Sequence, residues 1–275
     1  MVWGGDHQSA SRDTGKRFAM SEVDGEIRGY QEGFSDLVPG VYDVAARRRK
    51  AETTLRVLSD YFGARLTECR VLDVGASTGI IDAYLAPHVA QLLGVDIDTK
   101  ALAHAREHSQ DTNARYARAD ALALPVADRS VDAVICAHVY EHVPDAEQLL
   151  AEIHRVLKPG GVCYFAAGNR FQLVEPHYRV PLLSAIPRPL AHRLIRRLGI
   201  ADRYHELHFS LLGLRSLTAH FRRHDYTLRL IREHDRFATG YMLPRAPWLR
   251  RAIGLFAGVL YPVIPTYIWL LEREA

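Results

Sequence analysis

The sequence has little cysteine: its 275 residues include three, Cys69, Cys136 and Cys163. Their odd number and wide spacing argue against a disulfide framework. All three fall on or beside stretches predicted to be buried strands, so we expect reduced core cysteines in a reducing compartment. Residues 1–18 also lack the apolar core of a signal peptide, and we expect a cytoplasmic protein.

The sequence also lacks a large net charge, which is +3. Such a small excess does not by itself indicate a nucleic-acid partner, and the basic residues are not interleaved with aromatic side chains that stack on bases. We therefore expect no nucleic-acid partner. The positive charge is uneven, with a run at Arg47 to Lys50 and many arginines in the last third. Solvated helix faces, an anionic partner and a membrane surface all stay open as explanations.

A long uncharged stretch occurs once, at residues 252–271, and it is long enough for a membrane span. Pro262 and Pro265 argue against one straight helix. The stretch instead predicts an apolar helix at about 247–260, a proline turn and a closing strand at 266–274. Three alternatives remain for this helix: a buried lid or core helix, a helix lying in a membrane interface, and a true span.

Hydrophobic patterning predicts helices that alternate with strands from Val44 onward. The first helix ends near Gly63. The predicted strands are 69–75, 90–97, 115–120, 131–139 and 162–168, with helices at 80–89 and 99–109, another helix around Leu149 to Leu157, and a stop and turn at 158–161. Strands that alternate with helices at this spacing predict an α/β fold with a doubly wound, mostly parallel sheet.

The regular alternation ends after Gly168. The remainder predicts helices at 189–199 and 214–224, a strand at 226–233 and the closing strand. These make a seven-stranded sheet with helical lid insertions at about 171–213 and 235–263. We expect a flexible N-terminal segment, 1–35, followed by a single domain, 36–275.

Chemically active residues follow the carboxyl ends of the predicted strands, where open α/β sheets bind ligands. Asp73 begins a glycine-bearing turn, DVGASTG (73–79), and Asp96 ends the next strand. A carboxylate at this second position accepts hydrogen bonds from both hydroxyls of a ribose. The turn lacks the G-x-G-x-x-G spacing of NAD enzymes, so the turn alone does not identify a dinucleotide site.

Residues 138–142 spell H-x-x-E-H, the pattern of the inverted zinc proteases. A protease of that kind needs both histidines on one face of a helix. Here His138 falls at the end of an apolar strand, and Pro144 precedes the next helix. His138 and His142 are therefore not expected to share a helical face, which argues against a zinc protease.

Four segments in order, VLDVGASTG, LGVDID, ADALALPVADRSVDAVICAHVYEHVPD and HRVLKPGG, resemble the class I S-adenosylmethionine-dependent methyltransferases. The similarity covers roughly residues 65–168. It is to the broad methyltransferase-domain group that includes the quinone-biosynthesis C- and O-methyltransferases. It implies a Rossmann-like methyltransferase fold with S-adenosyl-L-methionine as cofactor, and it leaves the acceptor open.

The resemblance also implies a role for each strand-end residue. Asp73 would orient the turn, and Gly75, Ala76, Ser77 and Gly79 would lie along the methionine part of the cofactor. Ser77 stands where the family often has glycine. Asp96 would hold the ribose hydroxyls and Ile97 would pack on the adenine. Asp120 would accept from the adenine amino group near the Ala121 amide, and Ala137 and His138 would line the sulfonium side.

Some quinone O-methyltransferases are thought to contact a metal through the carboxylates and histidine of the loop at 138–142. His138 replaces the first of those acids here, and we expect no metal. For Glu141 and His142, a role in fixing the loop by hydrogen bonds stays open.

Methyl transfer to a hydroxyl group calls for a base, and histidine is the commonest one. The candidates are His177, His142, His205 and His208. We expect a methyltransferase of a small or lipid-like acceptor, with O-methylation favoured. Two alternatives stay open: a membrane-peripheral methyltransferase of a quinone, lipid or lipid-linked glycan, and a cofactor-binding or interaction protein without turnover.

Overall fold

The computed structural model describes residues 21–23, 26–28, 33–110 and 112–274. Their main feature is a seven-stranded sheet with the strand order β5-β4-β3-β6-β7-β9-β8. The strands β3 to β7 run parallel, and β9 lies antiparallel to both of its neighbours. This confirms the predicted doubly wound, mostly parallel sheet. The strand order reverses between β3 and β6, which is where such sheets bind ligands.

The first half of the sheet follows the predicted alternation. Its elements are α2 (Val44–Phe62), β3 (Arg70–Val74), α3 (Ile80–Leu85), β4 (Gln91–Asp96), α4 (Thr99–His108), β5 (Ala114–Arg118), β6 (Val131–Ala137), α5 (Ala146–Val156) and β7 (Leu157–Gly168). Asp98 is the N-cap of α4: its side chain accepts hydrogen bonds from the amides of Lys100 and Ala101, which fixes the start of the helix.

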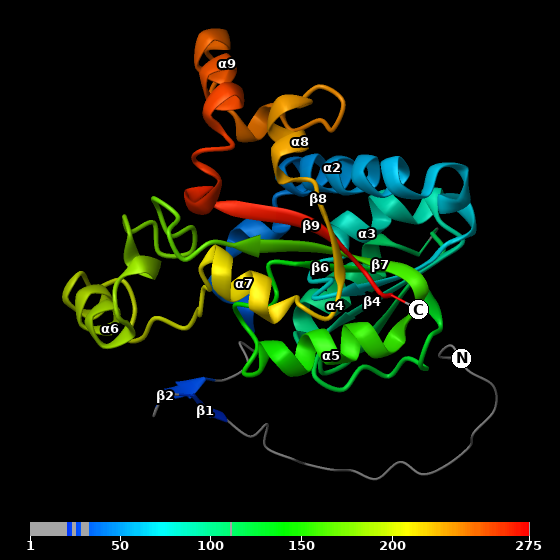
Figure 1. Ribbon diagram of the computed structural model, residues 1–275. Helices are drawn as coiled ribbons and strands as arrows, with labels where there is room; N and C mark the ends of the chain where they lie inside the picture. The colour runs from blue at the N-terminus through cyan, green and yellow to red at the C-terminus, as the bar shows by residue number, and fades with distance from the viewer. Residues whose placement is uncertain (1–20, 24–25, 29–32, 111, 275) are drawn as a thin grey trace.

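The apolar core lies on both faces of the sheet. Successive residues of a strand point to opposite faces, so Leu72 packs in one apolar cluster and Val71 in the other. Helices α2, α3 and α8 (Thr227–Arg232) cover one face, and α5 and α7 (Leu211–Leu217) cover the other (Figure 1). All three cysteines are buried and free, which confirms the expectation of core thiols.

The second half of the chain corrects two predictions. The predicted helix 214–224 is wrong in extent, because α7 ends at Leu217 and residues 222–225 form strand β8 (Arg222–Asp225). The predicted strand 226–233 is instead helix α8. Its N-cap Tyr226 and its residue Leu230 are both buried and lie one helical turn apart. The sixth strand of the sheet in chain order is therefore β8 and not 226–233. The sequence did not indicate β8, because it is a polar edge strand with no apolar alternation.

The predicted turn at 158–161 is also corrected, because β7 begins at Leu157. Leu157 pairs with Val131 and Val162 pairs with Ala133, so the pairing register shifts across the glycines. Gly160, at φ 75°, donates its amide to the carbonyl of Arg273 instead. The proline and glycines that predicted a turn therefore form a bulge inside strand β7.

Helix α9 (Pro247–Phe256) and strand β9 (Thr266–Glu272) confirm the predicted helix, turn and strand. The alternative of a buried lid or core helix is wrong, because no side chain of α9 is buried. No helix in the described part of the chain is long and apolar enough to cross a membrane.

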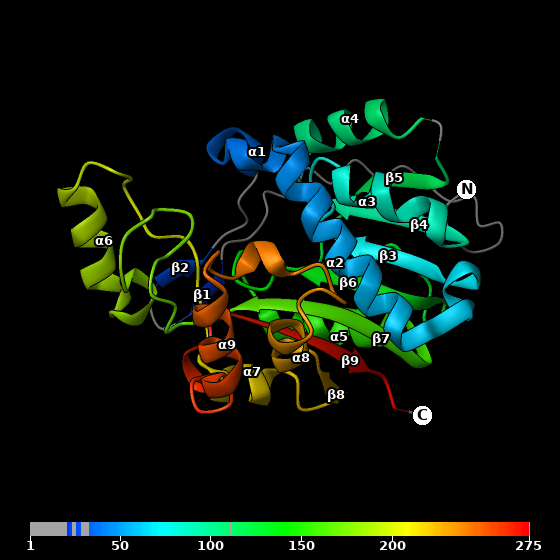
Figure 2. The same ribbon diagram turned by 90° about the horizontal axis from the view of Figure 1, so that it is seen from above.

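The predicted insertion at 171–213 contains α6 (Arg188–Arg197), as expected. It has a small apolar cluster of its own, separate from the two clusters of the sheet. Figures 1 and 2 show α6 beyond the end of the sheet toward which β7 points. The N-terminal segment predicted to be flexible lies mostly outside the described residues. The described parts of it are the strands β1 (Ser21–Val23) and β2 (Glu26–Arg28) and the start of α1 (Phe34–Leu37).

Candidate active site

The turn after β3 has a backbone that favours glycine. Gly75 and Gly79 have φ values of 81° and 70°, which L side chains rarely adopt. A Cβ on Gly75 would lie 2.6 Å from Cγ2 of Val139, so packing excludes a side chain there as well. Ser77 also has a positive φ, of 52°. Its amide donates to Oδ2 of Asp96 at 2.8 Å, which holds the turn against the end of β4.

Asp96 is oriented by two backbone amides. Its Oδ1 accepts from the amide of Asp98 at 2.9 Å, and its Oδ2 accepts from Ser77. Burial raises the pKa of Asp96, while these amides favour the charged form. The carboxylate stays half-buried at the end of its strand. A fixed, partly accessible carboxylate at this place suits the two hydroxyls of a ribose.

Asp73 forms a buried pair with an acid that the sequence analysis missed. The partner is Asp82 in the first turn of α3, which is completely buried. Burial raises the pKa of Asp73 to about 7, and burial together with Asp73 raises the pKa of Asp82. The pair therefore retains a proton, because two adjacent buried carboxyls do not both ionise readily.

Arg47 is a second residue that the sequence analysis did not single out. It comes from α2 and is partly buried near Asp73 and Asp96. Burial lowers its pKa, and the two carboxylates oppose that shift. The sequence signal was the basic run 47–50, which does not show which of its members turns inward. A guanidinium here is suited to a carboxylate on a ligand.

The predicted adenine-side residues lie along the same edge, because β3, β4 and β5 are adjacent. Asp120 follows β5, is half-buried, and accepts a hydrogen bond from the amide of Leu122 at 2.8 Å. Ala121 and Ile97 are also half-buried. The strand ends therefore bring together the residues that were predicted to hold the ribose and the adenine.

His138 follows the end of β6 at Ala137 and has a φ of 59°. Its Nδ1 lies 3.2 Å from Oε1 of Glu141, which is 1% exposed. Burial opposes ionisation of Glu141, but His138 and the neighbouring imidazoles hold its pKa at about 2. His138 and His142 do not lie in one helix, so the geometry is not that of a zinc protease.

His142 and His177 meet beyond this loop. Their ring centroids are 5.0 Å apart with the rings nearly perpendicular. Nδ1 of His142 lies 3.9 Å from Oε1 of Glu206, and burial lowers the pKa of His142 to about 4. The ring of Phe34 contacts both histidines. The segment at α1 is therefore part of the site, which the sequence analysis did not predict.

Helix α1 is held in place by the start of α4. The amide of Ser35 donates to Oδ2 of Asp98 at 2.9 Å, and Lys100 forms an ion pair with Asp36. Figure 2 shows α1 beside the first turn of α4. The cap of α4 thus also positions Phe34 over the two histidines.

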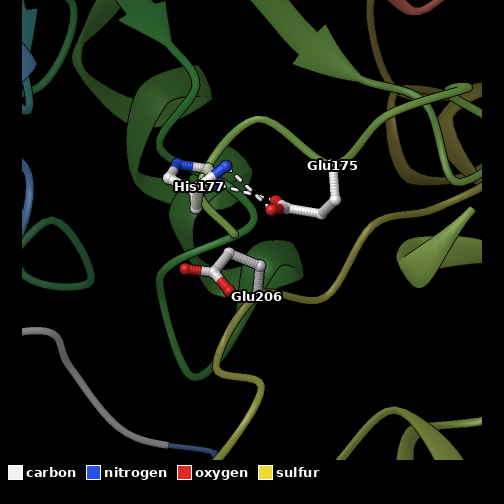
Figure 3. A group of neighbouring side chains, drawn as sticks. All are labelled: Glu175, His177 and Glu206. Carbon is white, nitrogen blue, oxygen red and sulfur yellow. Dashed lines mark hydrogen bonds and ion pairs between the residues drawn. The ribbon is translucent and has the colours of Figure 1, made fainter. Parts of the chain in front are cut away.

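Glu175 orients the side chain and backbone of His177 by hydrogen bonds. Its Oε1 lies 2.7 Å from Nδ1 of His177, and its Oε2 accepts from the amides of His177 and Tyr178 (Figure 3). Burial lowers the pKa of His177, but Glu175 and Glu206 outweigh it, and the pKa is raised. Among the described residues, no hydrogen-bond partner occupies Nε2 of His177.

The other two candidate histidines are placed differently. His208 is buried, and both ring nitrogens have partners: Tyr204 Oη at 3.1 Å and Gln172 Nε2 at 3.3 Å. His205 is exposed on the surface. The structure therefore brings His142, His177 and His208 together and leaves the side chain of His205 outside the group.

Glu175, His177 and Glu206 also offer a geometric group for a metal ion. Figure 3 shows the three side chains as neighbours. One ligand atom from each lies within 4.8 Å of the others. However, Glu175 already accepts one ring and two backbone hydrogen bonds. These contacts explain the buried carboxylate without an ion, because donors inside the protein satisfy both of its oxygens.

Comparison with protein families matches residues 72–165 to the family described as "Methyltransferase domain". This match covers the turn after β3, Asp96 at the end of β4, the loop after β6 and most of β7. The residues implied by the resemblance and the matched domain therefore coincide in the chain.

Curated relatives match a similar part. The ubiquinone biosynthesis O-methyltransferase of Coxiella burnetii is 30% identical over 141 residues, which are 50% of this chain and 60% of that protein. The biotin biosynthesis bifunctional protein BioHC of Cellvibrio japonicus is 37% identical over 118 residues, 43% of this chain and 23% of that protein. The chain thus spans less than two thirds of these relatives.

Solved structures share the fold at low identity. The [4+2]-cyclase SpnF matches with a TM-score of 0.55 and 19% identity, over 90% of this chain and 99% of that one. An S-adenosylmethionine dependent methyltransferase from Mesorhizobium loti matches with a TM-score of 0.53 and 19% identity, over 79% and 96%. One fold with a cyclase and a methyltransferase among its members does not specify the reaction. The sequence match is more specific than the fold: at residues 72–165 the chain matches the family described as "Methyltransferase domain".

Proposed function

We propose that the protein methylates a hydroxyl group of a small or lipid-like acceptor, with His177 as general base. The observation that supports this proposal best is the 2.7 Å contact between Nδ1 of His177 and Oε1 of Glu175. A carboxylate on Nδ1 fixes the tautomer whose Nε2 accepts a proton, and it stabilises the imidazolium that forms. The bound cofactor supplies the methyl group on its sulfonium.

The strand-end residues support a cofactor position next to this base. The turn at 75–79, Asp96 and Arg47 would hold the cofactor, and Ala137 ends a strand that leads directly into the loop of Glu141 and His142. Glu141, Glu206 and the imidazole of His142 would then surround the acceptor with polar groups. Phe34 would exclude water, which keeps the base and the acceptor hydroxyl in a low-dielectric environment.

His177 is favoured over the other histidines by its partners. His208 has both nitrogens engaged, and the neutral His142, with a pKa of about 4, is a weak base at neutral pH. The raised pKa of His177 suits proton transfer near neutral pH. The ubiquinone O-methyltransferase among the relatives supports oxygen as the methylated atom only by analogy.

The experiment uses purified protein, S-adenosylmethionine with an isotopically labelled methyl group, and extract of the host. Mass spectrometry should detect a product that gains one labelled methyl group, and blocking hydroxyl groups in the extract should abolish it. His177→Ala should lower turnover by a factor of about 10²–10⁴ while cofactor affinity, measured by calorimetry, stays nearly unchanged.

A metal-assisted reaction is the second candidate, because Glu175, His177 and Glu206 satisfy the distances of a metal group. Treatment of the protein with a chelator distinguishes general-base catalysis by His177 from a metal-assisted reaction. If the metal-free protein keeps full activity, the result supports His177 as general base. If activity is lost on chelation and returns when a divalent metal is added, the metal-assisted reaction is supported instead. A product methylated on carbon or nitrogen would refute O-methylation in either case.

A further inference from the structure

Large apolar side chains are exposed along α9 and the turn that follows it. Trp248 is 72% exposed, Leu255 75% and Val259 80%. Trp248 and Leu255 are seven residues apart in one helix, so they lie on the same face. The helix is joined to the body of the protein by Arg232, which donates to the carbonyl of Gly254 at 3.3 Å.

Exposed apolar side chains also lie on α6 and just after it: Leu190, Leu198 and Ile200 are 51%, 54% and 44% exposed. By contrast, the described residues between 45 and 170 contribute no large apolar side chain to the exposed surface. Apart from Val44, the large apolar side chains that are exposed in the described residues thus lie in the two insertions, 171–213 and 235–263. Exposed apolar side chains gathered on a few surface segments mark an interaction site.

The same two segments lack acidic residues. Residues 176–201 and 236–271 contain no aspartate or glutamate. Both contain arginines that are exposed in the structure: Arg193, Arg196, Arg197, Arg245 and Arg251. Arg250 is different, because its guanidinium donates to the carbonyls of Pro244 and Gly240. The surface is therefore apolar and cationic together.

We propose that this surface, formed by α6, α9 and the turn at 257–260, docks on an anionic membrane. Apolar side chains enter the region between headgroups and acyl chains, and arginines bind the anionic headgroups. A second copy of the chain fits less well. The usual symmetric dimer places a patch against itself, so it would bring the arginines of one copy against those of the other.

The position of this surface relates it to the site. Figures 1 and 2 show α6 and α9 at the end of the sheet toward which β7 points. Strand β6 runs parallel to β7 and ends at Ala137, so His138 follows a strand at this same end. Docking would therefore bring the acceptor side of the molecule to the bilayer. The docking itself does not depend on the proposed O-methylation, and the experiment below measures binding alone.

The test is flotation of the whole protein with vesicles of phosphatidylcholine, alone or mixed with phosphatidylglycerol. We expect binding to the mixed vesicles, weak binding to the neutral ones, and release by high salt. Arg193→Glu combined with Arg251→Glu should reduce the partition coefficient by a factor of about twenty or more. The matched control is Arg215→Glu with Arg222→Glu, which changes the same charge at exposed positions elsewhere and should bind like the parent.

The apolar contribution is tested with Leu255→Ser and Val259→Ser, which should reduce binding about tenfold. Leu212→Ser is the control, because Leu212 is 74% exposed on α7, which covers the opposite face of the sheet from α8. A variant that retains Trp248 as its one tryptophan should show a blue shift of fluorescence with anionic vesicles. Absence of binding to both kinds of vesicle, equal binding to both, or unchanged binding of both sets of variants would overturn the proposal.

Discussion

The residue pair Glu175 and His177 sets the expected pH dependence of the reaction. A base must be unprotonated, so activity should rise with pH through the pKa of His177, which lies above its ordinary value. Glu175→Gln removes a negative charge from the ring. It should shift the acidic limb of the kcat/KM profile to lower pH and reduce the maximal rate, because the tautomer is no longer fixed.

The control for this profile is Glu147→Gln, which removes an exposed acid of α5. Its acidic limb should coincide with that of the parent. An unchanged limb in Glu175→Gln would mean that a group other than His177 limits the reaction at low pH.

A second pair, Asp73 and Asp82, links buried charge to stability. A carboxyl whose pKa is raised in the folded protein stabilises the fold at low pH, and this contribution is lost as pH rises through the folded pKa. Asp82→Asn retains the shape of the side chain and removes its ionisation. Above pH 7 the variant should be more stable than the parent, by roughly 1–2 kcal/mol.

Urea denaturation at a series of pH values measures this difference. Asp235→Asn, at a carboxylate whose side chain is 95% exposed, should leave the pH dependence unchanged. If Asp82→Asn destabilises the protein equally at every pH, the acid makes a hydrogen bond that matters more than its ionisation.

At the scale of elements, α6 and the segments beside it form a unit with its own apolar cluster. This cluster is small, and it does not merge with the clusters that pack on the sheet. A region with few buried apolar contacts opens at lower free energy than the core strands. The insertion at 171–213 is thus suited to act as a lid that carries His177.

Ile195→Ala tests whether this unit opens independently. The completely buried Ile195 belongs to the small cluster, and its truncation should cost about 2–4 kcal/mol. Hydrogen exchange should accelerate within 171–213 and stay unchanged in β3 and β6. Ile135→Ala, in the sheet core, should instead accelerate exchange throughout the sheet. Equal acceleration in both variants would show one cooperative unit.

At the scale of the whole molecule, we expect a bound cofactor to stabilise the fold by linking the strand ends. The product S-adenosylhomocysteine should bind the folded chain and not the unfolded one. At about 100 times its Kd it should stabilise the fold by about 2.7 kcal/mol and raise Tm by roughly 5 °C or more. In Asp96→Ala, affinity should fall by roughly 1–3 kcal/mol, because the ribose hydroxyls lose a charged acceptor.

Calorimetry and thermal unfolding check this prediction together. Asp43→Ala is a useful comparison, because it removes the N-cap of α2 without altering the end of β4. It should lower Tm with and without ligand by the same amount. A ligand-dependent shift that is equal in Asp96→Ala and in the parent would remove Asp96 from the cofactor site.

The sequence by itself determined the parallel half of the sheet and its cofactor edge. There, local signals and global packing agree: apolar strands covered on both faces, an N-cap at Asp98, and glycines where φ is positive. The order of the strands then places Asp73, Asp96 and Asp120 at one edge. Such a pattern can be interpreted from the sequence because the local conformational preference of each residue agrees with its place in the fold.

Only the tertiary structure decided the rest. Strand β8 is polar because it lies at a sheet edge. Helix α8 is so short that the spacing of its apolar residues also fits a strand. Arg47, Asp82, Phe34, Glu175 and Glu206 belong to the site through contacts between segments far apart in the chain, which no local spacing reveals. The exposure of α9 is likewise a tertiary property, since an apolar helix has the same sequence whether protein or another surface covers it.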